Sequence, residues 1–371
     1  MTVRVIRPLP AIGRVVVKVG TSSLVTERGG VSRGRLDRVV TEVAVAARDR
    51  SCVLVSSGAI AAGLRPLGMT KRPSEVPALQ AAAAVGQGRL MAAYAEAFAR
   101  RRLVAAQVLL TQDDFVHRRQ FVNARNTLRR LLESAAVPVV NENDTVATEE
   151  IRFGDNDRLA ALVAVMIEAD LLVLLSDVDG IFSRDPRQGD AVLLSELSDA
   201  DEITAGGPHR GSGGMASKLE AARIATAAGI GVVVANAGRQ RVLARILAGE
   251  PEGTYLPPAP KRQRARKAWI AFVRDVRGRV VVDEGAAKAV REDGRSLLAA
   301  GVRAVEGSFA AGDAVEVAGP DGVAFARGIV NYGAAELPKL LGRTTADLAS
   351  LAGGPYDTEV IHKDQLVVIE A

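Results

Sequence analysis

The segment VVVKVGTSS at residues 15–23 decides the fold. It is an apolar, strand-like run that ends in a lysine, a glycine and three hydroxyl residues. Its valines are nearly continuous, which is typical of a strand that is buried on both faces, as in a parallel sheet. Five further runs share this character: Cys52–Val55, Val104–Leu110, Val137–Val140, Leu171–Leu175 and Gly231–Ala235.

The segments between these runs have the periodicity of amphipathic helices. They are rich in Ala, Leu and Arg, and the clearest are Ser32–Arg50, Ala78–Arg102 and Asp113–Ser134. Alternating strands and helices predict an α/β fold, in which a mostly parallel sheet is sandwiched by helices.

This pattern stops near residue 255, where prolines and a basic run follow. We predict a linker over residues 257–267, between a first domain at residues 1–256 and a second domain at residues 268–371. Four strand-like pieces punctuated by Gly and Asp predict that the second domain is small and β-rich. They are Arg279–Val282, Ala314–Val317, Val323–Ile329 and Gln365–Ile369.

The composition is that of an ordinary globular protein. The 371 residues are 48% apolar and 25% charged, with a formal net charge of +5. The longest apolar stretch is interrupted by two acids, so we predict no membrane span, and we recognise no signal peptide. The single cysteine, Cys52, excludes an internal disulfide framework, is expected to be a buried structural thiol, and fits a cytoplasmic protein.

Residues that follow the strands carry the functional prediction, because ligands of an open parallel sheet bind at the carboxyl ends of its strands. Lys18 is costly to bury unless its ammonium meets an anionic partner, and Gly20 lets the backbone approach closely. After the second run, Ser57 and the small residues up to Gly63 can offer backbone N–H groups to an anion. Tight helix packing explains the same small residues equally well.

Two clusters of Asn and Asp after the fourth run are the most informative part of the chain. They are NENDT at residues 141–145 and FGDND at residues 153–157, and the second opens a predicted helix. A solvated loop with a helix cap explains one Asp but not this density. Such a cluster can hold the α-ammonium of an amino acid, or position a lysine through charged hydrogen bonds.

Two further loops suit a nucleotide. SDVDGIF at residues 176–182 follows the fifth run, and GSGGMASK at residues 211–218 precedes a predicted helix at Leu219–Ala228. Backbone N–H groups and the helix N-terminus can hold phosphates there, and Lys218 adds a positive charge. The spacing is not that of a Walker A loop. The three histidines lack metal-ligand spacing, so we predict no His/Cys metal site.

Over essentially its whole length, the chain resembles the amino acid kinase superfamily, and within it the glutamate 5-kinases. The motifs that carry the resemblance are KVGTS from Lys18, SGAIAAG from Ser57, NEND from Asn141, GDND from Gly154 and GGMASK from Gly213. The two Asn/Asp motifs are the ones that point to glutamate 5-kinases. The C-terminal part resembles a PUA domain, through GSF from Gly307, GDAV from Gly312 and ARGIV from Ala326.

This resemblance implies an enzyme that uses ATP and Mg²⁺ to phosphorylate the γ-carboxylate of L-glutamate to L-glutamyl 5-phosphate, the first step of proline biosynthesis. It implies that Lys18 and Lys218 act on the transferring phosphoryl group and that Asp157 orients them. The residues implied to bind glutamate are Ser57, Asp144, Asn156 and, close by, Asp155. Those implied to bind ATP are Lys18, Ser176, Asp177, Ser212, Gly213, Gly214, Met215, Ala216, Ser217 and Lys218. A homo-oligomer and feedback inhibition by proline are further implications.

Two other functions stay open at this point. A different kinase of the same fold would act on acetylglutamate, aspartate, carbamate or UMP, although the carboxylate-rich clusters suit an amino acid with a free α-ammonium and suit UMP poorly. A protein that binds or modifies RNA would use the PUA-like domain and the basic run from Lys261 to Arg279. That run has few interleaved aromatic residues, so we do not expect RNA binding.

Overall fold

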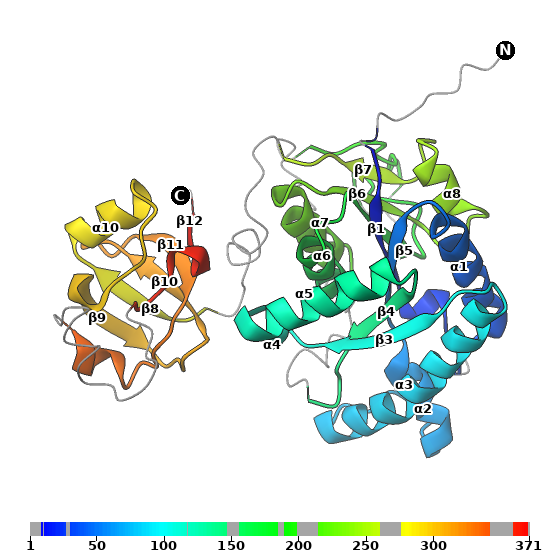
Figure 1. Ribbon diagram of the computed structural model, residues 1–371, viewed down its shortest axis with the longest axis horizontal. Coiled ribbons are helices and arrows are strands. Elements are labelled where there is room, and N and C mark those ends of the chain that lie inside the picture. The colour runs from blue at the N-terminus through cyan, green and yellow to red at the C-terminus, as the bar shows by residue number, and fades with distance from the viewer. Residues whose placement is uncertain are drawn as a thin grey trace, which may run out of the picture. The chain divides into compact units, whose positions relative to one another are not determined.

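The structure is a computed structural model that describes residues 9, 11–26, 30–116, 118–146, 156–184, 189–198, 214–259, 276–341 and 359–369. The chain divides into two compact units, Met1–Arg262 and Gln263–Ala371. Each unit has its own sheet and its own hydrophobic core (Figure 1). The predicted linker stays a prediction, because residues 260–275 lie outside the described ranges.

The first unit is built on a seven-stranded sheet with the order β3-β4-β2-β1-β5-β6-β7. Its strands are β1 (Arg14–Val19), β2 (Ser51–Ser56), β3 (Ala105–Leu110), β4 (Val137–Glu142), β5 (Leu171–Ser176), β6 (Gly231–Asn236) and β7 (Thr254–Leu256). Six strands are parallel, and β7 is antiparallel to β6. The predicted parallel α/β fold is therefore confirmed, whereas β7 has no counterpart in the prediction.

The helices of this unit cover both faces of the sheet (Figure 1). They are α1 (Arg33–Ala46), α2 (Ala59–Leu64), α3 (Val76–Ala99), α4 (Asp113–Val116), α5 (Arg118–Glu133), α6 (Asp157–Met166), α7 (Met215–Ala227) and α8 (Val242–Leu247), with short 3-10 helices at Thr21–Ser23 and Arg65–Leu67. On one face of the sheet, α1 contacts both α3 and α8. On the other face, α6 and α7 pack against each other.

The alternation of side chains along β1 sends its lysine to one particular face. Val15, Val17 and Val19 belong to the core cluster that includes residues of α1 and α3. Successive side chains of a strand point to opposite faces, so Val16 and Lys18 face the other layer. That layer contains α6, which contacts β1. Lys18 is thereby directed towards α6 and α7.

The short helix α2 crosses α3 with the two backbones in contact. A Cβ atom at Gly63 would lie 1.8 Å from the carbonyl oxygen of Ala82, and one at Gly86 would lie 1.7 Å from the carbonyl oxygen of Ala59. Only glycine fits at either position, because real Cβ contacts are never this short. Gly63 therefore serves helix packing, which is the alternative explanation for the small residues after Ser57.

The second unit contains a five-stranded sheet with the order β12-β11-β10-β8-β9. Its elements are β8 (Val276–Val282), α10 (Glu284–Arg291), β9 (Val302–Gly307), β10 (Ala314–Ala318), β11 (Ala324–Ile329) and β12 (Leu366–Val368), with 3-10 helices at Ala299–Gly301, Leu337–Leu340 and Lys363–Gln365. The predicted β-rich domain is confirmed, and β9 and α10 add to it.

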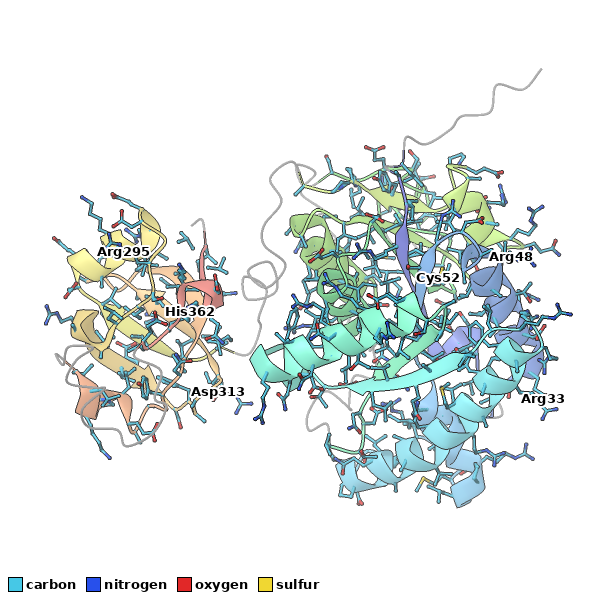
Figure 2. All side chains as sticks on the ribbon, viewed as in Figure 1. Arg33, Arg48, Cys52, Arg295, Asp313 and His362 are labelled. Atoms are coloured by element: carbon cyan, nitrogen blue, oxygen red, sulfur yellow. The ribbon has the colours of Figure 1, made fainter. Side chains whose placement is uncertain are left out.

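Two predictions from composition can be compared with the described residues. Cys52 lies within the core on β2, and burial raises the pKa of its thiol to about 12 against the opposing effect of Arg50 (Figure 2). It is a structural thiol, as predicted. In the described part of the chain, no helix combines the length and the apolar character that crossing a membrane requires.

Candidate active site

The carboxyl ends of the central strands bring the predicted residues to one edge of the sheet. β1 lies between β2 and β5. Its last residue, Val19, pairs with Ser56 of β2 on one side and with Leu175 of β5 on the other. The strand order reverses at this point, which is where open α/β sheets bind their ligands. Ser57 and Ser176, which follow Ser56 and Leu175, therefore flank the end of β1.

Asp157 is the centre of a buried charge cluster at this edge. It is the first residue of α6 and is 0% exposed. Its Oδ1 lies 2.6 Å from Nζ of Lys18, and its Oδ2 lies 2.9 Å from Nζ of Lys218. The hydroxyl of Ser217 also donates to Oδ2, at 3.2 Å. One carboxylate thus holds two lysines that come from β1 and α7.

The carboxylate of Asp157 stays ionised despite its burial. Burial by itself opposes ionisation of Asp157, but Lys18 and Lys218 together hold the pKa of this carboxyl below its ordinary value. Lys18 and Lys218 are only 4% and 6% exposed. Two ammonium groups and one carboxylate leave a net positive charge in a nearly dry place. Such a cluster suits an anion with high charge density, because fixed positive charges act strongly in a low-dielectric site.

The start of α7 lies beside this cluster. Its N-cap residue, Gly214, makes no side-chain capping hydrogen bond, and Met215 and Ala216 form the first turn. The first N–H groups of a helix carry partial positive charge and need partners. Lys218 projects from the same end of the helix, so backbone dipole and side-chain charge act on the same point.

Asn156, which precedes Asp157, is held by a buried amide network. Its Nδ2 donates to the carbonyl oxygen of Ser56 and to Oδ1 of Asn141, both at 2.6 Å. Nδ2 of Asn141 donates in turn to Oε1 of Gln87 on α3, at 2.7 Å. Asn141 and Asn156 are 2% and 4% exposed. The network ties β2, β4 and α3 to the first turn of α6.

The turn after β2 leaves one buried hydroxyl without a partner. Ser57 is 4% exposed, and its Oγ makes no hydrogen bond within the described ranges. The next residue, Gly58, has φ +100°, and a Cβ there would meet Val25 Cγ2 at 3.0 Å. A left-handed conformation of this kind favours glycine. An orphaned buried hydroxyl is unfavourable, so this turn is suited to a polar ligand.

Asp144 lies beyond β4 and is also largely buried, at 9% exposure. Burial raises the pKa of its carboxyl to about 6, and the charge of Arg72 acts in the opposite direction. A buried carboxylate with a raised pKa gains from a cationic ligand, because a nearby positive charge stabilises the ionised form.

The remaining predicted residues are accounted for as follows. Ser176 is buried and donates to Oδ1 of the exposed Asp177 at 3.1 Å. Asp155, Ser212 and Gly213 lie outside the described residues. Gln87 and Asn141 contribute to the site but were not assigned roles by the sequence. Asn141 stands in the NEND motif, which is a usable signal, whereas Gln87 stands in mid-helix with none.

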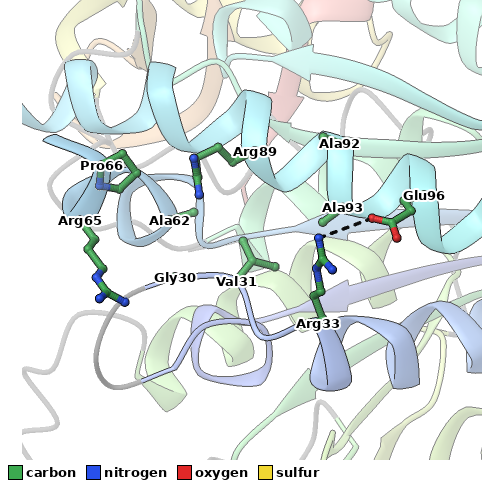
Figure 3. A pocket seen from close by; sticks show the side chains of 10 residues that line it. All are labelled: Gly30, Val31, Arg33, Ala62, Arg65, Pro66, Arg89, Ala92, Ala93 and Glu96. Atoms are coloured by element: carbon green, nitrogen blue, oxygen red, sulfur yellow. Dashed lines mark ion pairs between the residues drawn. The ribbon is translucent and has the colours of Figure 1, made fainter.

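A cavity elsewhere in the first unit is lined by none of the residues assigned above to ATP, glutamate or the charge cluster. It has a volume of about 670 Å³ and is lined by Gly30, Val31, Arg33, Ala62, Arg65, Pro66, Arg89, Ala92, Ala93 and Glu96 (Figure 3). Arg33 faces Glu96 at 4.0 Å (Figure 3). Volume alone is therefore a poor guide to the chemistry of this molecule, and the charge cluster around Asp157 is the better candidate.

Comparisons with known proteins agree with the geometry. The profile of the amino acid kinase family matches residues 13–236, and that of the PUA domain matches residues 278–351. A protein named glutamate 5-kinase from Salinispora arenicola (strain CNS-205) is 53% identical over 366 residues, which cover 97% of this chain and 98% of that protein. A glutamate 5-kinase from Streptomyces coelicolor (strain ATCC BAA-471 / A3(2) / M145) is 50% identical, over 96% of this chain and 96% of that protein. One from Geobacter sp. (strain M21) is 45% identical, over 97% of this chain and 99% of that protein.

Proposed function

The chain belongs to the amino acid kinase family and, within it, to the glutamate 5-kinases, and from this we propose that the cluster of Lys18, Asp157 and Lys218 performs its phosphoryl transfer. The reaction moves the γ-phosphoryl group of ATP to the γ-carboxylate of L-glutamate and gives L-glutamyl 5-phosphate, the first step of proline biosynthesis. The observation that carries the proposal is the fully buried carboxylate of Asp157 between two lysines, at the point where the strand order reverses.

The acceptor of this reaction needs no general base. Carboxyl groups of the Glu type titrate near pH 4.3, so the γ-carboxylate is already a nucleophile at neutral pH. The protein has to align the reactants and neutralise charge on the transferring phosphoryl group. Lys18 and Lys218 supply that positive charge from positions that are already fixed, and Asp157 keeps them there.

We assign the amino acid end of glutamate to Ser57, Asp144 and Asn156. The hydroxyl of Ser57 lacks a partner in the described residues, and Asp144 gains from a neighbouring cation. Both properties suit a zwitterionic ligand. The assignment of Asp155 to the same subsite rests on the GDND motif alone.

We assign ATP to Ser176, Asp177 and the loop Ser212–Lys218, including Gly213, Gly214, Met215, Ala216 and Ser217. The start of α7, whose N-cap residue Gly214 brings no side chain between the helix N-terminus and a ligand, supports phosphate binding there. Lys18 completes the phosphate subsite from β1. Because Lys218 lies on α7, the nucleotide phosphates and the charge cluster adjoin each other.

Mg²⁺ fits this site as a companion of the nucleotide. Within the described ranges, no group of three or more His, Cys, Asp or Glu side chains could hold a metal ion, and both oxygens of Asp157 face lysines. Mg²⁺ keeps several waters and is often held by substrate phosphates. We therefore assign its ligands to phosphate oxygens and water, where it neutralises phosphate charge.

Further parts of the proposal concern regulation and setting. Proline has an α-carboxylate and a protonated secondary amine where glutamate has a primary ammonium, and it lacks the γ-carboxylate, so it would occupy the amino acid subsite without reacting. We propose that it inhibits in this way and that the protein is a cytoplasmic homo-oligomer.

The test is to trap the acyl phosphate. Purified protein is incubated with ATP, Mg²⁺ and hydroxylamine, and glutamate, acetylglutamate, aspartate or UMP is the acceptor. We expect ADP release and hydroxamate formation with glutamate alone. Activity with a different acceptor would retain the fold but reject glutamate as substrate, and the absence of turnover with all four would reject the kinase assignment.

A further inference from the structure

Three side-chain amides form a chain that reaches from the middle of α3 to the active site. Gln87 accepts from Asn141 at 2.7 Å, and Asn141 accepts from Asn156 at 2.6 Å. The members come from α3, β4 and the residue before α6, so the chain joins three elements that are far apart in sequence. None of the roles assigned above involves Gln87 or Asn141.

Two backbone groups identify the direction of this chain. The backbone N–H of Glu142 donates to Oδ1 of Asn141 at 2.9 Å, and the carbonyl oxygen of Ser56 accepts from Nδ2 of Asn156 at 2.6 Å. A backbone N–H can only donate and a carbonyl can only accept. The oxygen and nitrogen of both amides are therefore distinguishable by their partners, and neither amide can be turned over without losing a buried hydrogen bond.

This direction determines which atom Asn156 offers to a ligand. Both N–H bonds of its Nδ2 are used, by Ser56 and by Asn141. Its Oδ1 accepts no hydrogen bond from the residues that the structure describes. The amide therefore presents an acceptor. An acceptor recognises an ammonium group and not a carboxylate.

We infer that Gln87 is a positioning residue, which orients Asn141 and through it Asn156, so that the carbonyl oxygen of Asn156 accepts from the α-ammonium of glutamate. This inference rests on the proposed function, because it assigns the group of the substrate that Asn156 binds. It also separates the roles of the pocket residues, since an amide locked in the opposite direction would recognise the α-carboxylate.

Gln87 can orient Asn141 because a buried N–H group without an acceptor is costly in free energy. Without the oxygen of Gln87, Nδ2 of Asn141 loses its acceptor in a place where Asn141 is 2% exposed. If Asn141 turned over to find another, its Nδ2 would face Nδ2 of Asn156, donor against donor. Asn156 would then lose the orientation that makes its oxygen available.

The experiment compares two substitutions of Gln87 in the full-length enzyme. Gln87→Met has a similar size and no oxygen, whereas Gln87→Glu keeps an oxygen that can accept from Asn141. Val43→Ala on α1, in the buried core, controls for a loss of stability alone. Steady-state KM values for glutamate and ATP are measured together with inhibition constants of glutarate, which lacks the α-ammonium, and 4-aminobutyrate, which lacks the α-carboxylate.

In Gln87→Met we expect KM for glutamate and the inhibition constant of 4-aminobutyrate to rise about tenfold, the effect of one disrupted buried hydrogen bond. The inhibition constant of glutarate and KM for ATP should stay as in the wild type, and Gln87→Glu and Val43→Ala should behave as the wild type does. A parallel rise for glutarate, an unchanged constant for 4-aminobutyrate, or equal losses in Gln87→Glu or Val43→Ala would overturn the inference. Wild-type protein that fails to phosphorylate glutamate would instead overturn the proposed function.

Discussion

Each carboxylate oxygen of Asp157 contacts one lysine, Oδ1 Lys18 and Oδ2 Lys218. Substitutions at the lysines and at Asp157 therefore have different consequences for folding. Removing one lysine leaves the carboxylate with the other as its partner. Removing Asp157 takes away the one carboxylate that both buried ammonium groups share, which is strongly destabilising. The lysines are therefore the better positions at which to separate catalysis from folding.

The substitution Lys218→Met should lower kcat by roughly 100- to 1,000-fold, the usual effect of losing one preorganised charge-stabilising donor. The melting temperature should change little, because Asp157 keeps Lys18. Steady-state kinetics and a thermal melt measure both quantities. Lys71→Met, at an exposed lysine, is the matched control. Turnover that matches the control would reject the role of Lys218.

The substitution Asp144→Asn should raise the stability of the protein at neutral pH and weaken its binding of glutamate. The pKa of Asp144 is raised to about 6 in the folded protein, chiefly by burial, from an ordinary value of 3.8. The folded state thus binds the proton more tightly than the unfolded state, so this group lowers stability as pH rises from about 4 to about 6. An uncharged Asn escapes this cost, which is worth about 2–3 kcal/mol.

Chemical denaturation near pH 4 and near pH 7.5 checks this prediction: the variant should be more stable than the wild type only at the higher pH. KM for glutamate should rise while KM for ATP stays nearly constant. Equal losses for both substrates would indicate a structural role for Asp144. A stability difference that does not depend on pH would show that Asp144 is not perturbed by burial.

At the residue scale, sequence reasoning located charges better than amides. Lys18 and Lys218 could be predicted because a lysine at a strand end or in a Gly-rich loop needs an anion. Both lie within 2.9 Å of the carboxylate of Asp157, although the three residues are distant in sequence, while their roles in the reaction stay predictions. Gln87 could not be predicted, since a polar residue within a long helix carries no sign of which strand it faces.

Among the secondary-structure elements, continuous apolar runs predicted six strands to within two residues, because burial on both faces leaves no alternation to misjudge. The exception to that burial is β3, which lies at the edge of the sheet and is only partly buried. The failures were elements with weaker patterns. β9 has mostly exposed side chains and lies at the edge of its sheet, and α10 has only eight residues. The crossing of α2 and α3 was recognisable only as one of two explanations for the same small residues.

Two glycines of α3 provide a matched test of that crossing. A methyl group at Gly86 would overlap the carbonyl oxygen of Ala59, whereas at Gly88 it would meet nothing within 4 Å. Gly86→Ala should therefore destabilise the protein by about 3 kcal/mol. Gly88→Ala should stabilise it by up to about 1 kcal/mol, through helix propensity.

Urea unfolding of both glycine variants measures these free energies. Because α2 begins two residues after Ser57, Gly86→Ala should also raise KM for glutamate, and Gly88→Ala should not. Similar stabilities for the two variants would contradict the close contact of the helices.

At the scale of the whole molecule, the two units have separate hydrophobic cores, with no residue in common. All residues assigned to glutamate and ATP precede residue 262, where the first unit ends. The division into units could be anticipated from the proline-rich segment and the change in pattern after residue 255. What the second unit contributes could not, since fold alone does not specify function.

A chain that ends after Arg262 should therefore fold and phosphorylate glutamate with kcat/KM near that of the full chain. Circular dichroism and the hydroxamate assay measure folding and activity. A truncated chain that is folded but inactive would show that the second unit contributes to catalysis. One that does not fold would show that the two cores depend on each other.

The amide chain from Gln87 to Asn156 also bears on how this enzyme can diverge. Its direction depends on a main-chain N–H and a main-chain carbonyl, which every descendant with this backbone inherits, and on the side-chain oxygen of Gln87, which a substitution can remove. An enzyme that arises from this one by gene duplication and keeps Gln87, Asn141 and Asn156 therefore keeps its preference for a free amino group, and new substrates are open to it mainly at the end that receives the phosphoryl group.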